Sequence, residues 1–73
     1  MSVLFTGNDL VVTSPQSSWV RVQVFDMLGN NRGSFRANVS GSHVFSLQYL
    51  EQGRYLVRVN SGSSIQNLNV LIK

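Results

Sequence analysis

Cysteine is absent from this 73-residue chain, and proline occurs once, at position 15. Without cysteine the chain forms no disulfide and no thiolate–metal site, so its fold rests on packing and backbone hydrogen bonds. Long apolar runs are absent too, and none approaches the roughly 18–20 residues that a membrane helix needs. We therefore expect one small domain, residues 1–73, that does not span a membrane.

Charge of either sign is sparse. Six Lys and Arg residues stand against three acids, which gives a formal net charge of +3. Nucleic-acid-binding domains carry denser clusters of Lys and Arg than this chain does. We therefore expect no nucleic-acid partner, and the mild positive charge serves solubility or an anionic protein or envelope partner.

Alternating hydrophobicity is the clearest positive pattern. Val20, Val22 and Val24 alternate with Arg21 and Gln23, which predicts a strand with one buried face. Comparable segments separated by turn-forming residues are 3–5, 10–13, 19–25, 34–39, 43–50, 54–59 and 65–73. About seven short strands of this kind predict an all-β fold, an antiparallel sandwich or barrel.

The inward-facing positions of these strands form the predicted core. They are Leu10, Val12, Val20, Val22, Val24, Phe45, Leu47, Tyr55, Val57, Val59, Leu68, Val70 and Ile72. Phe35 and Ala37 share one strand face and are expected to join this core, while Leu50 is expected to close one end of it. Each buried Leu, Val or Ile contributes about 1.5–3 kcal/mol to stability.

The sequence offers little for catalysis. Asp9, Asp26 and Glu51 are the three carboxylates, and each stands alone, whereas glycoside hydrolysis needs two carboxyl groups across the scissile bond. His43 has no second His or Cys as a metal partner. Residues 26–31 supply one carboxylate where calcium loops use several. We predict a non-catalytic chain without metal or cofactor.

Three turn residues have predicted structural roles. Asp26 follows a strand directly and is expected to cap the next turn through its carboxylate. Gly29 is expected to take a positive φ, which costs other residues energy. Gly53 precedes the strand at 54–59 and marks another turn.

The outward positions offer two alternative binding surfaces. Trp19, Phe25 and Tyr49 could stack sugar rings, with Asn and Gln residues reaching the hydroxyls; otherwise Trp19 covers the rim and Phe25 packs beside the turn. Cations form the second surface, which is either a solvated face or a site for an anionic partner. Its residues are Arg21, Arg54, Arg58 and Lys73.

The ordered set VQVFDMLGN, FSLQYLEQGRYLVRV and VLIK carries a resemblance. It resembles the C-terminal sorting domains of the bacterial type IX secretion system, and most closely the basic C-terminal modules of secreted plant-cell-wall-degrading enzymes of fibrobacters. The matching residues are Val24-Phe25-Asp26 and Gly29, then Leu47, Leu50, Gly53, Tyr55, Val57 and Val59, and finally Val70-Leu71-Ile72-Lys73. The resemblance covers roughly residues 10 to 73.

The resemblance implies a seven-stranded immunoglobulin-like sandwich that ends a larger exported protein. Its implied role is non-catalytic: passage across the outer membrane, or retention at the surface of a Gram-negative-type bacterium. Residues 1–73, which open without the features of a signal peptide, would then be a monomeric module excised from an exported enzyme such as a glycoside hydrolase of xylan degradation. Its partner would be the secretion machinery or an anionic envelope component. The alternative is a carbohydrate-binding accessory module that stacks plant polysaccharide on surface aromatics.

Overall fold

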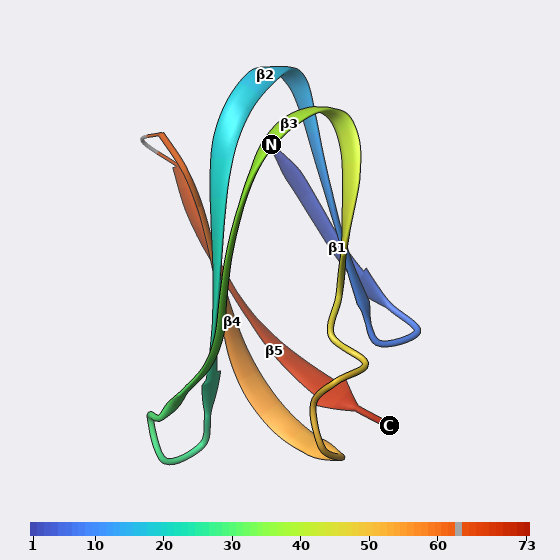
Figure 1. The fold of residues 1–73 in the computed structure, drawn as a ribbon, viewed down its shortest axis with the longest axis vertical. Helices are drawn as coiled ribbons and strands as arrows, with labels where there is room; N and C mark the ends of the chain where they lie inside the picture. The colour runs from blue at the N-terminus through green and yellow to red at the C-terminus, as the bar shows by residue number, and fades with distance from the viewer. Residues whose placement is uncertain (63) are drawn as a thin grey trace.

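The computed structural model describes residues 1–62 and 64–73, which form five β-strands in one antiparallel sheet (Figure 1). The strands are β1 (Ser2–Thr6), β2 (Asp9–Asp26), β3 (Asn31–Ser46), β4 (Gly53–Ser61) and β5 (Ser64–Ile72). Helices are absent from these residues, so none of them forms a helix that could cross a membrane. The predicted all-β, antiparallel class is confirmed.

The two longest strands curl the sheet. β2 and β3 span 18 and 16 residues and arch over together, so the sheet folds back on itself (Figure 1). The first half of β2 pairs with β1 on one side and with the end of β3 on the other. Its second half pairs with the start of β3 and with β4, and β5 lies outside β4. The sheet therefore has two parts that face each other across the core. The three-stranded part consists of β1, the first half of β2 and the end of β3. The four-stranded part consists of the start of β3, the second half of β2, β4 and β5.

The predicted count of about seven strands is wrong. Segments 10–13 and 19–25 both belong to β2. Segment 34–39 and the first part of segment 43–50 both belong to β3, which ends at Ser46, so residues 47–50 are not in a strand. The pairing of β2 with β3 passes from Ser14 with Gly41 directly to Ser18 with Val39. Pro15 lies in the skipped stretch, where its missing N–H costs no ladder bond. The chain bends at this bulge instead of ending two strands, and an immunoglobulin-like sandwich is not confirmed.

The predicted core is confirmed with two corrections. Its buried apolar residues are Leu10, Val12, Val20, Val22, Val24, Val39, Phe45, Leu47, Tyr55, Val57, Val59, Val70 and Ile72. Leu68 is only half-buried, because it lies on the unpaired edge of β5, beside a groove. Val39 is buried although it was not predicted to be, because it lies on the same side of β3 as Phe35 and Ala37. Phe35, Ala37 and Leu50 pack against this core.

The β1–β2 turn holds the two ends of the strand order together. Gly7 and Asn8 have φ values of 54° and 66°, the pattern of a two-residue type I′ hairpin turn. The Asn8 amide donates to the Lys73 carbonyl at 3.0 Å and accepts from the Lys73 N–H at 3.2 Å. Gln66 donates to the Met1 carbonyl at 3.2 Å. These bonds bridge a groove of about 640 Å³ between β1 and β5.

Candidate functional site

The outer surface of the four-stranded part gathers most of the cations of the chain. Because the valines of β2 point inward, the residues between them point outward, and the pairing register continues this pattern across β3, β4 and β5. We call this surface the arginine face. Its polar and aromatic residues are Trp19, Arg21, Gln23, Phe25, Ser34, Arg36, Asn38, Arg54, Arg58, Asn60, Asn67 and Asn69, and the apolar Leu56, Ile65 and Leu71 lie among them.

Two arginines lie directly opposite each other at the centre of this face. Arg21 on β2 pairs in register with Arg36 on β3. Side chains in such positions have Cβ atoms about 4.5–5.5 Å apart, and like charges there destabilise a sheet. On the other side of β2, Arg21 is paired with Asn60, and Gln23 with Arg58. The strands that carry Arg21 and Arg58 are thus neighbours, and Arg36 extends their row of cations.

No carboxylate belongs to the arginine face. Asp9 begins β2 in the three-stranded part, and Glu51 lies in the connection before β4. Asp26 ends β2 and accepts from the Arg32 Nε at 2.9 Å, which is the one ion pair within residues 1–62 and 64–73. The arginines of the face therefore have no acidic partner among the described residues.

Two open hollows flank the central arginines. Their volumes are about 390 Å³ and 300 Å³, and Arg21 and Arg36 line both. Gln23 and Ser34 contribute polar atoms to the first hollow, and Asn60 contributes to the second. The pair thus stands between two depressions whose other polar groups are neutral.

Aromatic rings hold two of the arginines in place. Trp19 is 59% exposed, and the guanidinium carbon of Arg36 lies 5.3 Å from the centre of its ring. The corresponding distance from Arg58 to the ring of Phe25 is 6.0 Å. Arg58 also donates from Nε to the Asn67 Oδ1 at 3.3 Å. Cation–π contacts and this hydrogen bond restrict both side chains before any ligand arrives.

Two of the predicted surface residues lie away from this face. Tyr49 follows β3 and packs edge-on against Phe35, with ring centres 6.0 Å apart. Phe35 is paired with the buried Val22 and points to the inner side. Ile65 on β5 lies in the same cross-strand row as Arg21 and Asn60. Lys73 follows β5 eight positions later, so it is far from Arg21 along the strand. The structure therefore does not bring Tyr49 together with the other predicted residues, and it places Lys73 at the far end of the face, two positions beyond the partner of Arg54 and away from Arg21 and Arg36.

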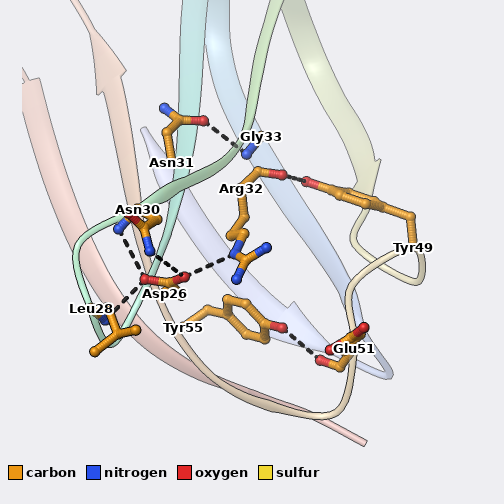
Figure 2. A network of polar contacts seen from close by, with 9 residues as sticks. All are labelled: Asp26, Leu28, Asn30, Asn31, Arg32, Gly33, Tyr49, Glu51 and Tyr55. Carbon is orange, nitrogen blue, oxygen red and sulfur yellow. Dashed lines mark hydrogen bonds and ion pairs between the residues drawn. The ribbon is translucent and has the colours of Figure 1, made fainter.

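The turn after β2 is organised by one carboxylate (Figure 2). Asp26 Oδ1 accepts from the backbone N–H groups of Leu28 and Asn30, both at 2.9 Å, and Oδ2 accepts from the Asn30 amide and from Arg32. Gly29 has a φ of 86° and donates to the Asp26 carbonyl at 3.0 Å. The hydrogen bond from the Asn30 backbone N–H does most to lower the pKa of Asp26. Desolvation acts against it, while the Arg32 side chain and the Leu28 backbone N–H lower the pKa further.

Tyrosine hydroxyls join the neighbouring loops to this turn (Figure 2). Tyr49 donates to the Arg32 carbonyl at 3.1 Å, and Tyr55 donates to the Glu51 carbonyl at 2.8 Å. A side chain at Gly33 would collide with the Tyr49 hydroxyl. Partial burial raises the pKa of Tyr49, and Tyr55 adds to this effect. Gly53, with a φ of 151°, begins β4 beside Tyr55.

The titratable residues of the chain do not converge. Asp9 and Asp26 stand at opposite ends of β2, and His43 packs against Phe45 with ring centres 4.6 Å apart. In the part of the chain that the structure describes, no three His, Cys, Asp or Glu residues form a group that could hold a metal ion. The arginine face is the arrangement with the clearest binding chemistry.

Sequence reasoning missed Arg36 and Asn60 as members of this face. The signal for Arg36 was available, since Phe35 and Ala37 were expected to point inward and Arg36 lies between them. That Arg36 stands opposite Arg21 depends on the register of β2 with β3, which no single segment specifies.

A comparison with protein-family models and with curated proteins finds no match to this chain.

Proposed function

We propose that this chain is a non-catalytic attachment module, which binds an anionic component of the cell envelope or of the extracellular surroundings through its arginine face. The observation that carries the proposal is the in-register pair of Arg21 and Arg36 on a surface without carboxylates. Such a pair costs stability when it is empty. An anion between the two guanidinium groups removes that cost and accepts charge-assisted hydrogen bonds.

The resemblance to sorting domains supports a setting for this activity. A module of this kind would follow the catalytic domain of an exported enzyme, such as a glycoside hydrolase, and would serve its secretion or its retention at the outer cell surface. The immunoglobulin-like sandwich implied by the same resemblance would carry the binding residues on the outer side of one sheet. The arginine face itself stands on the register of β2 with β3 and β4, with or without that fold relationship.

The first test is retention on anionic polymers. We expect the protein to be retained on immobilised dextran sulfate or polyphosphate, and to be released as salt rises, because exposed charges are screened within about 10 Å at 0.1 M ionic strength. Neutral dextran should not retain it. The double variant Arg21→Gln/Arg36→Gln should elute at clearly lower salt than Lys73→Gln.

The control carries equal weight. Lys73→Gln removes a positive charge far from the Arg21–Arg36 pair and should change the elution only slightly. If the eluting salt concentration fell by the same amount per lost charge at Arg21, Arg36 and Lys73, net charge alone would explain the retention. That result would contradict an attachment site. The sorting role is tested by export of a carrier protein that ends in this module, with and without the double substitution.

A second candidate function rests on Trp19. Its 59% exposure and the amides beside it are suited to stacking and hydrogen bonding of a neutral polysaccharide. Titration with xylan or cello-oligosaccharides, followed by Trp19 fluorescence, separates the two functions. Saturable quenching that is insensitive to salt would favour neutral sugar binding.

A further inference from the structure

We infer that Arg21 and Arg36 form a carboxylate-binding subsite for an acidic polysaccharide, with one uronate group between the two guanidinium groups and an adjoining sugar ring against Trp19. This inference rests on the proposed attachment function and specifies the chemical class of its ligand. It is argued from the arrangement of charge, ring and amide around one pair of residues.

The charge at this position favours a compact anion. Arg21 and Arg36 are paired in register, and they extend from neighbouring strands of the sheet. A planar carboxylate can accept hydrogen bonds from two guanidinium groups at once, one at each oxygen. Because the face has no carboxylate of its own among the described residues, this acceptor has to come from a ligand.

The neighbours of the pair favour a sugar as the carrier of that anion. Trp19 lies two positions before Arg21 on the same side of β2, and its ring already holds Arg36 at 5.3 Å. Asn38 pairs with Trp19 across one side of β2, and Asn60 pairs with Arg21 across the other. Amides donate to and accept from hydroxyl groups equally well, which suits a polyol ligand.

The shape of the surface favours a chain over a single small molecule. The hollows of about 390 Å³ and 300 Å³ lie on either side of the two arginines and are continuous with the open sheet. Neither is an enclosed cavity of the kind that buries most of a small ligand. A polysaccharide can cross the strands here, with its acidic unit at the pair and neutral units in both hollows.

The geometry distinguishes this ligand from other polyanions. A nucleic acid or a polyphosphate presents a charge on every unit and is best met by a long cationic track. Here the two paired arginines are flanked by neutral amides, and the next arginine along the face, Arg58, is held by Phe25 and Asn67. One charged unit among neutral ones fits this pattern better than a continuous line of phosphates.

The experiment compares polymers that differ only in the carboxylate. Affinity for a glucuronoxylan, whose uronate groups are separated by neutral xylose units, is measured by calorimetry and by Trp19 fluorescence, beside its carboxyl-reduced form, its methyl ester, polyphosphate and single-stranded DNA. We expect the tightest saturable binding to the acidic polysaccharide, accompanied by a change in Trp19 emission, weaker binding to polyphosphate and DNA, and no binding to the carboxyl-reduced polymer or the methyl ester. Arg21→Gln and Arg36→Gln should each weaken it about tenfold or more, because each removes charge-assisted hydrogen bonds.

Variants separate the site from general charge. Lys73→Gln should leave the affinity within about twofold, since it removes the same charge outside the site. Arg36→Lys keeps the charge but loses the planar fork, so it should bind less tightly than the native protein and more tightly than Arg36→Gln. Thermal melts of every variant establish that it is folded.

Each remaining outcome has one meaning. Equal binding of the carboxyl-reduced polymer overturns the carboxylate subsite, as does equal loss in Lys73→Gln. Tighter binding of polyphosphate or DNA, with the same arginine dependence, overturns the inference but leaves the attachment function standing. Failure to bind any polyanion at low salt overturns both.

Discussion

At the scale of single residues, the carboxylate of Asp26 organises the turn between β2 and β3. It accepts from two backbone N–H groups, from the Asn30 amide and from Arg32. The acceptor role of an Asp after a strand is predictable from sequence, because its short side chain reaches N–H groups two positions ahead. The hydrogen bond from Arg32 could not be predicted from the sequence, because it depends on the position at which β3 begins.

Asp26 gives a prediction about acid stability. The hydrogen bonds favour the charged carboxylate, so the pKa of Asp26 in the folded protein lies below its unfolded value of about 3.9. The resulting stabilisation is complete above about pH 5, one unit above the unfolded pKa, and is lost as the pH falls through the lowered folded pKa. In urea melts, Asp26→Asn should be less stable than the native protein at neutral pH, and the difference should shrink in acid.

Asp26→Ala is the companion variant, and it should lower the urea midpoint further, because it also removes the remaining acceptor oxygen. A difference between native protein and Asp26→Asn that stays constant from neutral pH down to pH 2 would contradict this account.

Gly33 gives a second prediction at this scale. A Cβ at this position would collide with the Tyr49 hydroxyl, so Gly33→Ala should cost about 1–3 kcal/mol, as overpacking does. In the Tyr49→Phe background the colliding oxygen is gone, and the same substitution should cost clearly less. Chemical denaturation of the four proteins forms a double-mutant cycle, and strictly additive costs would show that the contact is absent.

At the scale of elements, the alternation of buried and exposed residues within a strand can be predicted from the sequence. Where one strand ends and the next begins cannot. The inward valines of β2 and β4 follow from alternation alone, which is why most of the core was predicted correctly. Pro15 lies outside the ladder, where its missing N–H costs no hydrogen bond. Its serine-rich surroundings resemble a loop, yet the long strand simply bends there, with the Ser14 hydroxyl donating to the Gln16 carbonyl at 2.6 Å.

Asn8 carries the prediction at the scale of elements. It has a φ of 66°, and its amide makes both bonds to the Lys73 backbone. Asn8→Gly keeps the backbone conformation and removes the bonds, so it should cost about 0.5–1.5 kcal/mol per lost hydrogen bond at most. Asn8→Ala loses the bonds and adds strain, and it should be less stable than Asn8→Gly by about 1 kcal/mol.

Amide hydrogen exchange reads out the same contact locally. Faster exchange in β1 and at the end of β5, with β2 and β4 unchanged, is expected for Asn8→Gly. Uniformly faster exchange across all strands would show that Asn8 supports the whole sheet instead of this closure.

At the scale of the whole molecule, charge is segregated. The arginine face carries four of the six cations, while the three carboxylates lie at strand ends and in a connection. Which residues point outward could be predicted from alternation, and Arg21 and Arg58 were assigned correctly to outer strand faces. The residues opposite them on the neighbouring strands could not be predicted, because the register of the strands is set by the turns and by the bulge after Ser14.

This segregation predicts an unusual gain in stability. Without a ligand, Arg21→Gln removes a repulsion from Arg36 and should stabilise the protein by about 0.2–1 kcal/mol at low ionic strength. The gain should disappear in concentrated salt, which screens the repulsion. Thermal melts at several salt concentrations measure it, with Lys73→Gln as the control that should change little. A destabilised Arg21→Gln, or a gain insensitive to salt, would contradict the repulsion.

The incomplete closure between β1 and β5 has a consequence for how copies of this chain meet one another. A sheet edge normally invites pairing with a neighbouring molecule, and many proteins guard it with proline or lysine. Here the edge strands β1 and β5 line one groove, and Asn8 and Gln66 join them across it, whereas β3 keeps its outer edge unpaired. Two edge strands are thereby made less accessible for pairing with another copy of the chain, and amide side chains do this instead of proline or lysine.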